Sequence, residues 1–571
     1  MFLRKQTTNI AWRASRFSRL NSTKAAGNAT FKQIPHSSFF LQHRTKILLS
    51  TLVGASAVVY LTNDEVSGTV KFVAHSLKRI NSVTVALARC LYNYKSTLSR
   101  QYDTKEDYYS ALSQCHLDSA KITLGALEHN GGIYIKLGQH ISAMTYLLPK
   151  EWTETMTPLQ DKCPESAYEE INAMFLKDWG QSIDEVFEEF DRKPIGVASL
   201  AQVHLAKMRG TGELVAVKCQ HPSLTEFVPL DIAMTALVFN ALDFVFPEYP
   251  LTWLSDEMRD SIHVELDFHN EARNSQNTKE YFERFENITA LRIPKIVKTT
   301  KRILVMEYLR GERLDNLEYI SQKHIDRSQV SSCLSHIFNN MIFTPGVGIH
   351  CDPHGGNLAI RSHTPTHTNP FNFEIILYDH GLYRQLTNEM RYDYAQFWLA
   401  MIDNDQAKMK QYALKFANIQ ESQFPLFAAA ITGRDIDNAL NFDIESQRSD
   451  AEIANMKSKI THEEVLVDLM SILANVPRVV LLILKTNDLT RHLDEVLQNP
   501  LGLKRTFLIL SNYCADTIYK LDQRKASRLE GSWYNRWLAY LKNWWVWELR
   551  RSQLFRYDLI VYWSRLFGLE P

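Results

Sequence analysis

The fold of the chain is indicated first by one short stretch, His350-Cys351-Asp352-Pro353-His354-Gly355-Gly356-Asn357. It places an asparagine five residues after an aspartate. A second aspartate, Asp379, follows in an Asp-His-Gly triplet directly after the apolar run 375–377. Phosphoryl-transfer sites place their base and their metal ligands in this order along the chain. Because Asp-x-x-x-x-Asn alone also fits a turn, the prediction depends on the segments before and after it.

The preceding segment contains the parts of a small kinase-like lobe. Pro194-Ile195-Gly196-Val197-Ala198-Ser199-Leu200-Ala201-Gln202-Val203 fits the register of a Gly-x-Gly-x-x-Gly-x-Val loop, with Ala198 and Ala201 in place of the second and third glycines. Alanine disfavours the positive φ that glycine allows, so we expect this loop to hold phosphate differently. Val215-Ala216-Val217-Lys218 follows, and in kinases a lysine ending such a strand contacts the α- and β-phosphates.

A glutamate that could pair with Lys218 lies in the segment 264–274, at Glu271. Asp267 is one helix turn away, so a solvated acidic helix face is the alternative interpretation. The long separation from Lys218 implies an inserted helical segment over about residues 228–248. The apolar residues 303–309, which include Glu307, fit either the hinge between two kinase lobes or an ordinary core strand.

The segment after Asp379 departs from protein kinases. Before Asp379, the polar residues 361–370 are predicted to join two strands of a catalytic hairpin. After Asp379, a helix is expected to follow with only a short connection, over residues 389–399. Neither an Ala-Pro-Glu triplet nor a long activation loop occurs in the sequence here. The platform that holds a protein substrate in kinases is therefore predicted to be missing.

The N-terminal region indicates targeting and a membrane anchor. Residues 1–45 are rich in arginine and serine and contain no acidic residue, which is typical of a mitochondrial presequence; a basic tail is the alternative. The uncharged segment within 46–62 is predicted to be a transmembrane helix, with a buried helix as the alternative. Basic residues precede it and acidic residues follow, so we expect the bulk of the chain to face the intermembrane space.

Helices are predicted through residues 63–182, which include Lys136-Leu137-Gly138-Gln139. Lys136 and Gln139 are three residues apart and share a helix face. Gly138 lowers helix propensity by about 1 kcal/mol against alanine, which suggests that another segment approaches closely. From the residues alone, this helix is interpreted as a surface helix.

The amino-acid composition limits which partners, metal sites and covalent links are expected. The 571 residues carry 64 Lys+Arg and 64 Asp+Glu, and this balance argues against a dominant nucleic-acid role. The seven cysteines form no Cys-x-x-Cys pair, so neither a zinc site nor a disulfide framework is indicated. The final residues 521–571 interleave tryptophan with arginine and lysine, which fits a helix on a membrane surface or one packed on the large lobe.

In combination these motifs resemble the UbiB family of atypical kinase-like proteins, which contain the aarF domain, and in particular its mitochondrial inner-membrane members from fungi. The resemblance covers about residues 120–400. Lys136-Leu137-Gly138-Gln139 matches the family's Lys-x-Gly-Gln motif, Glu265-Leu266-Asp267 matches its Glu-x-Asp motif, and Gly196-Val197-Ala198-Ser199 stands at its alanine-rich loop. The resemblance implies that Lys136, Gln139, Glu265 and Asp267 meet where a helix covers the active site. Two departures from the patterns are His380, where kinases have phenylalanine, and the start of the loop at Gly196-Val197.

The resulting fold prediction is α+β: a two-lobed kinase-like fold with covering N-terminal helices and a helical C-terminal extension. The small lobe is assigned to residues 183–311 and the large lobe to residues 312–520. The candidate catalytic residues are Asp352, Lys218 and Glu271, and Asn357 and Asp379 are the candidate metal ligands. The candidate ATP-binding residues are Gly196, Val197, Ala198, Ser199, Val203, Lys218 and Glu307.

The expected cofactors are ATP and Mg²⁺. The resemblance implies ATPase or small-molecule kinase activity in coenzyme Q and lipid homeostasis. Lipids of the mitochondrial inner membrane and coenzyme Q or its precursors are the expected partners, and the sequence names no protein partner. A pseudokinase scaffold that binds nucleotide as a switch and a true protein kinase are the alternatives.

Overall fold

The computed structural model describes residues 64–144, 148–160, 163–247, 251–351, 354–432, 472, 475–501, 503–528 and 533–567. It divides the chain into two units, residues 1–74 and residues 75–571. The described parts of the candidate site all lie in the second unit. The predicted presequence, the predicted transmembrane helix and Asp352 fall outside the described residues.

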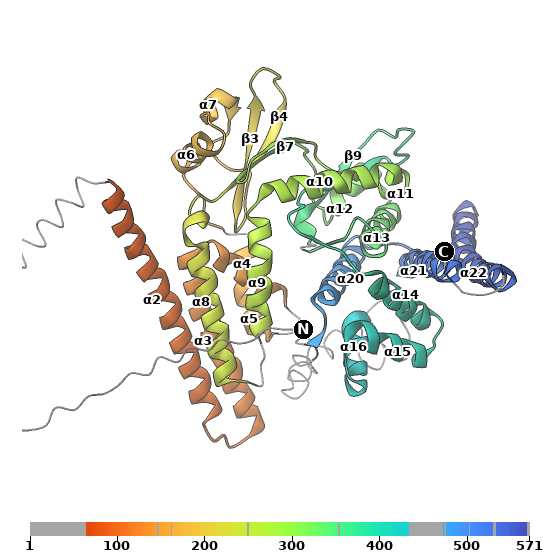
Figure 1. The fold of residues 1–571 in the computed structure, drawn as a ribbon, viewed down its shortest axis with the longest axis horizontal. Coiled ribbons are helices and arrows are strands. Elements are labelled where there is room, and N and C mark those ends of the chain that lie inside the picture. The colour runs from red at the N-terminus through yellow and green to blue at the C-terminus, as the bar shows by residue number, and fades with distance from the viewer. Residues whose placement is uncertain are drawn as a thin grey trace, which may run out of the picture. The chain divides into compact units, whose positions relative to one another are not determined.

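A six-stranded antiparallel sheet forms the centre of the small lobe (Figure 1). Its strands are β1 (Phe187–Phe190), β2 (Gly196–Val197), β3 (Ala201–Met208), β4 (Leu214–Gln220), β6 (Ile296–Thr299) and β7 (Ile303–Glu307). The order is β1-β3-β4-β7-β6, and β2 pairs with β3. Side chains alternate between the two faces of a strand. Val215 and Val217 therefore pack with Phe175 on one face, while Ala216 packs with Phe268 on the other. Lys218 continues the second series, so it points toward the helix that carries Phe268.

Helices precede the sheet and are also inserted after β4. They are α2 (Asp64–Leu98), α3 (Lys105–Asn130), α4 (Ile133–Ala143), α5 (Lys150–Met156), η1 (Thr157–Gln160), α6 (Tyr168–Asp178), α7 (Ile183–Val186), α8 (Leu224–Val245), α9 (Thr252–Glu265) and α10 (Phe268–Phe282). The predicted insertion near 228–248 is confirmed as α8. Among the described helices, α8 is the one long and apolar enough to cross a membrane. Its Val228 and Phe239 are buried in the same core as α4.

The expectation that the Lys-x-Gly-Gln helix lies on the surface is wrong. In α4, Ile133, Ile135 and Leu137 are almost fully buried. They pack against α8 and α9, whose buried side chains include Leu254. The expected close approach is confirmed, because a Cβ atom built on Gly138 would lie 2.1 Å from Leu159 Cδ1.

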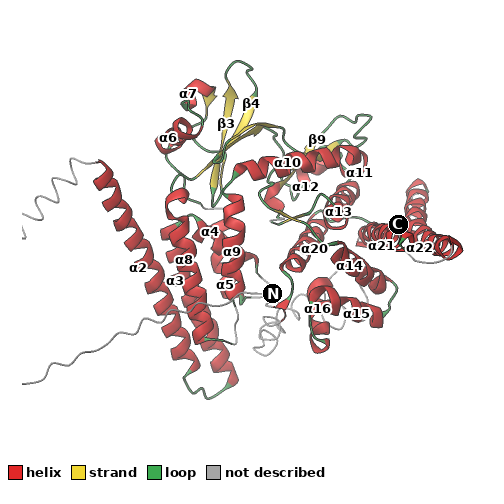
Figure 2. Ribbon diagram, viewed as in Figure 1, coloured by secondary structure: helices red, strands yellow, loops and turns green. Residues whose placement is uncertain are grey.

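The rest of the described chain is mainly helical (Figure 2). Its elements are η2 (Glu283–Phe285), α11 (Glu286–Thr289), β5 (Leu291–Arg292), α12 (Leu317–Gln322), α13 (Arg327–Phe343), β8 (Ile349–His350), η3 (Gly355–Asn357), β9 (Leu358–Ser362), β10 (Phe373–Leu377), β11 (Tyr383–Arg384), α14 (Asn388–Ile402), α15 (Gln406–Ala417), η4 (Glu421–Gln423), α16 (Phe424–Thr432), α20 (Arg478–Val496), α21 (Leu503–Ser527) and α22 (Trp533–Leu566). The predicted catalytic hairpin is confirmed, since β9 and β10 pair antiparallel. Helix α14 begins nine residues after Asp379, as expected.

These mixed helices and sheets confirm the predicted α+β class. At the C-terminal end, one face of α22 packs on α21: the Trp547 ring stacks on Tyr519 with centroids 5.0 Å apart. The other tryptophans described in α22 are exposed. The predicted boundaries between the lobes stay predictions.

Candidate active site

Lys218 lies at the centre of a charged triad. Strand β4 places its Nζ atom 2.6 Å from Glu271 Oε1 and 2.9 Å from Asp379 Oδ1. Helix α10 supplies Glu271: it begins after Asp267, whose side chain accepts a hydrogen bond from His269 N at 3.0 Å. This N-cap fixes the first turn of α10, which carries Glu271.

Burial makes these contacts electrostatically strong. Burial by itself lowers the pKa of Lys218, but Glu271 and Asp379 outweigh it and raise the pKa above the ordinary lysine value. Burial raises the pKa of Glu271, and Lys218 opposes that shift. A buried ammonium of this kind is stable only beside anionic partners, so the triad holds a positive charge at one fixed point.

Asp379 and Asn357 lie at the same end of the β9–β10 hairpin. Leu358 and Leu377 are directly opposite each other in the pairing, and Asn357 and Tyr378 extend the strands by one residue. Tyr378 N donates to Asn357 O at 3.0 Å, which brings the loop that carries Asp379 against Asn357. A carboxylate and an amide oxygen at one hairpin end fit a hard cation such as Mg²⁺, which also takes phosphate oxygens as ligands.

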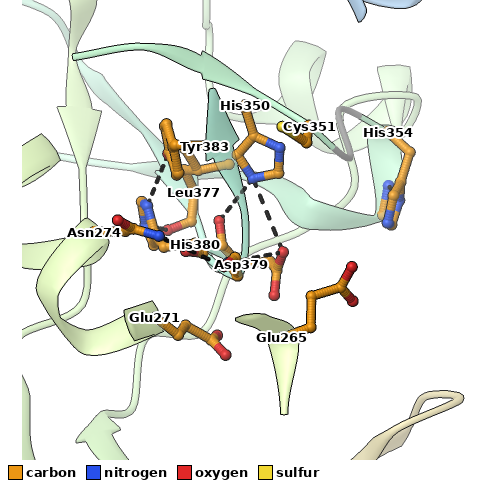
Figure 3. Close-up of polar contacts among 12 residues, drawn as sticks. Glu265, Glu271, Asn274, His350, Cys351, His354, Leu377, Asp379, His380 and Tyr383 are labelled. Carbon is orange, nitrogen blue, oxygen red and sulfur yellow. Dashed lines mark hydrogen bonds and ion pairs between the residues drawn. The ribbon is translucent and has the colours of Figure 1, made fainter. Parts of the chain in front are cut away.

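Asp379 is held by a buried cluster of three rings, His350, His380 and Tyr383. A positioning role for this cluster was not predicted from the sequence. His350 Nε2 forms a hydrogen bond with Asp379 O at 2.9 Å and lies 3.9 Å from Asp379 Oδ2. Figure 3 shows Asp379 between His350 on one side and Glu265 and Glu271 on the other. Tyr383 faces His350 across the β8–β11 pair. The position of His350, two residues before Asp352, is the sequence signal that could have identified this role.

His380 fills the position that phenylalanine holds in kinases. It is 1% exposed, and burial lowers its pKa to about 3, so the ring is neutral. His380 Nδ1 lies 2.9 Å from Tyr383 Oη, and the two rings are nearly parallel. Asn274 Nδ2 donates to His380 O at 3.0 Å. A neutral, hydrogen-bonded histidine therefore provides the packing that the substitution had put in doubt.

The helix α4 reaches the triad through an ion pair. Lys136 Nζ contacts Glu265 Oε2, and the side chains are 13% and 14% exposed. Glu265 ends α9 and lies beside the Asp-His-Gly turn, since its Cγ is 4.0 Å from a Cβ built on Gly381. The Lys-x-Gly-Gln helix is thus tied to the edge of the candidate metal site.

The expectation that four residues meet here holds for two of them. Gln139 turns away, and its Nε2 donates to Leu159 O at 3.0 Å. Asp267 is used as the α10 N-cap. The reason is geometric: residues three apart on a helix are neighbours but not parallel. With Lys136 directed at Glu265, Gln139 faces η1.

The predicted nucleotide loop is a tight hairpin between β2 and β3. Gly196 pairs with Val203, and Ala198 N donates to Ala201 O at 2.8 Å. Neither Ala198 nor Ala201 adopts a positive φ, so alanine is tolerated. A buried histidine supports the turn from below: His221 Nε2 lies 3.0 Å from Ala198 O. Ser199 is buried at the same turn.

The remaining predicted ATP-binding residues surround the lysine. Val203 is paired directly with Lys218 across β3 and β4. Glu307 ends β7 at the predicted hinge, but its carboxylate is taken by Arg292 Nη2 at 2.6 Å and by Lys295 N at 3.1 Å. The Glu307 N–H also donates to Lys295 O, at 2.8 Å. The roles assigned to all of these residues stay predictions.

Comparisons with known proteins bear on the family of this chain. A family profile described as the ABC1 atypical kinase-like domain matches residues 158–413. The chain is 56% identical to "ABC1 family protein MCP2" of Saccharomyces cerevisiae, over 94% of this chain and 95% of that protein. It is 44% identical to the "ABC1 family protein MCP2 homolog" of Schizosaccharomyces pombe, over 83% and 86%. It is 35% identical to "AarF domain-containing kinase 1" of Drosophila melanogaster, over 84% and 90%.

Proposed function

The chain belongs to the ABC1 family of atypical kinase-like proteins, and we propose that it binds Mg-ATP and acts as an ATPase or as a small-molecule or lipid kinase. The observation that carries this proposal is the triad of Lys218, Glu271 and Asp379. A lysine held by a buried glutamate, beside an aspartate at a hairpin end, is the arrangement that positions phosphates in kinases.

Each residue then has a role. Lys218 orients the α- and β-phosphates, and Glu271 fixes the lysine. Asn357 and Asp379 would hold Mg²⁺, which when bound neutralises charge that develops on the phosphates. Asp352 positions the attacking oxygen or accepts its proton. His350 and His380 hold the Asp379 backbone in place and touch neither the phosphates nor the acceptor.

The covering helix makes a protein acceptor unfavourable. Lys136 bridges to Glu265 beside Gly381. Residues 379–388 are all described, and they run straight into α14 without a substrate platform. We therefore favour water or a small lipid as the acceptor.

Nucleotide binding tests the first half of the proposal. The affinity of the full chain for a fluorescent ATP analogue is measured with and without Mg²⁺, and the same is done for Asp379→Asn. We expect Mg²⁺ to raise the affinity of the wild type and not of the variant. Asp315→Asn is the control, since Asp315 pairs with the exposed Arg313 in the large lobe. Equal Mg²⁺ dependence in all three proteins would contradict the proposal. Binding without turnover would instead favour the pseudokinase scaffold.

We also propose single-pass anchoring in the mitochondrial inner membrane, with the bulk in the intermembrane space, and a role in coenzyme Q and lipid homeostasis. The arginine-rich start and the uncharged segment within 46–62 support this placement. Protease treatment of mitochondria with intact or ruptured outer membranes tests it. Cleavage only after rupture is expected, and protection after rupture would overturn the orientation.

A further inference from the structure

The outward face of α22 is covered with large hydrophobic side chains. Fourteen of them in this helix are between 41% and 71% exposed, among them Trp537, Leu541, Trp545, Leu559 and Trp563. More than half of the exposed large hydrophobic residues in the described chain lie on this one helix. Contiguous exposed apolar surfaces of this kind mark sites of interaction.

The opposite face of α22 packs against the rest of the fold. Trp547 Nε1 donates to Asp516 of α21, and Arg550 contacts Asp403 after α14. Leu541 and Leu559 are each nine residues from Arg550. At 3.6 residues per turn, this separation is two and a half turns and points both leucines away from the packed face.

The charges beside this face favour an anionic surface. The sequence of α22 holds six lysine and arginine residues against two acidic residues. One of the acidic residues, Asp558, accepts a hydrogen bond from Arg505 Nε of α21 at 2.8 Å. Lys542, Arg551 and Arg556 are exposed on the same helix as the hydrophobic face. A second copy of this chain would bring the same positive charges against one another, which costs binding energy.

The side chains themselves fit the boundary of a bilayer. Trp537, Trp544, Trp545 and Trp563 are all exposed on α22. Tryptophan prefers the membrane interface because its ring is apolar and its N–H can meet water or headgroups. Exposed cations next to such a face bind anionic lipids and keep the helix in the plane of the membrane.

We propose that the outward face of α22 lies on the surface of a bilayer that contains anionic phospholipids. This surface lies in the C-terminal extension and is a different segment from the predicted anchor within 46–62. The proposal does not depend on nucleotide turnover, so either can fail without the other.

Quenching of tryptophan fluorescence by brominated acyl chains tests this contact. The full chain is reconstituted in vesicles of brominated phosphatidylcholine, with or without phosphatidylglycerol. Leu541→Glu/Leu559→Glu keeps every tryptophan and places two carboxylates in the centre of the face, and glutamate retains helix propensity. Leu176→Glu is the matched control, because Leu176 is 51% exposed on α6.

We expect at least twofold more quenching in the wild type and in Leu176→Glu than in the double variant, and more quenching with phosphatidylglycerol than without it. Equal quenching in all three proteins would overturn the proposal. A wild-type dimer that the double variant dissociates, with unchanged quenching, would assign the face to a second copy and would also overturn it. Matching far-UV circular dichroism of the three proteins shows that the variants fold.

Discussion

The close contact at Gly138 makes a quantitative prediction for Gly138→Ala. A Cβ atom there would lie 2.1 Å from Leu159 Cδ1 and 3.1 Å from Leu127 Cδ1. Leu159 is fully buried, so it can yield only by displacing its neighbours. Alanine gains about 1 kcal/mol in helix propensity over glycine. Overpacking costs about 1–3 kcal/mol. We therefore expect α4 to be destabilised by up to about 2 kcal/mol, the difference of these terms.

Gly125→Ala supplies the reference. Gly125 lies inside α3, and a Cβ atom there would meet nothing within 4 Å. This variant should stabilise its helix by about 0.5–1 kcal/mol. The two substitutions have the same chemistry, so the difference between them isolates the contact with Leu159.

Native-state amide hydrogen exchange measures both variants helix by helix, because it reports the opening of each element separately. Each 1.4 kcal/mol changes the opening equilibrium about tenfold. Exchange in α4 should speed up in Gly138→Ala, and exchange in α3 should slow down in Gly125→Ala. Slower exchange in α4 of Gly138→Ala would refute the close-contact argument.

Three further substitutions have defined outcomes. Arg79→Met leaves the buried Asp231 without its cationic partner, since the Asp231 carboxylate lies 2.9 Å from Arg79 Nε. Denaturation should show that the free energy of unfolding falls by about 3–5 kcal/mol. A smaller loss when Asp231→Leu is added would confirm the cause. Burial lowers the pKa of His336 from 6.5 to about 4. The neutral His336 ring therefore contributes its full stability to the folded state above pH 6.5, and this contribution is lost as the pH falls toward 4. At pH 5 the loss is about 2 kcal/mol. Denaturant titrations at pH 7 and pH 5 should show that His336→Gln loses less stability between these pH values than the wild type does. Equal losses in the two proteins would contradict this assignment. Glu271→Gln removes one of the two carboxylates within 3 Å of Lys218 and should weaken ATP binding about tenfold in a fluorescence titration, a change of about 1.4 kcal/mol; unchanged affinity would count against the triad.

The sequence predicted the order of the site because strong local signals mark it. The run 215–218 is apolar and was predicted to end the strand at Lys218. The structure continues β4 to Gln220 and gives Lys218 the partner expected at Glu271. The hairpin after Asn357 followed from two apolar runs separated by a polar loop. The hairpin pattern is local, whereas the pair of Lys218 and Glu271 is 53 residues apart and followed from the order of these motifs in kinases.

The failures concern tertiary contacts. Helix α4 has apolar residues on most of its surface, and nothing local shows that α8 and α9 cover it. The direction of Gln139 depends on where η1 lies. The C-terminal helix is apolar on two faces, so periodicity alone could not tell which face packs. His350 and Tyr383 act through backbone contacts that pattern matching does not detect.

The fate of the γ-phosphate tests the central claim most directly. The full chain in liposomes receives γ-labelled ATP with Mg²⁺, and the label is separated into inorganic phosphate, lipid extract and protein for the wild type and for Asp379→Asn. We predict label in inorganic phosphate or lipid for the wild type, and its loss in the variant. Label on the protein, equal release by the variant, or no release by a wild type that binds ATP would contradict it.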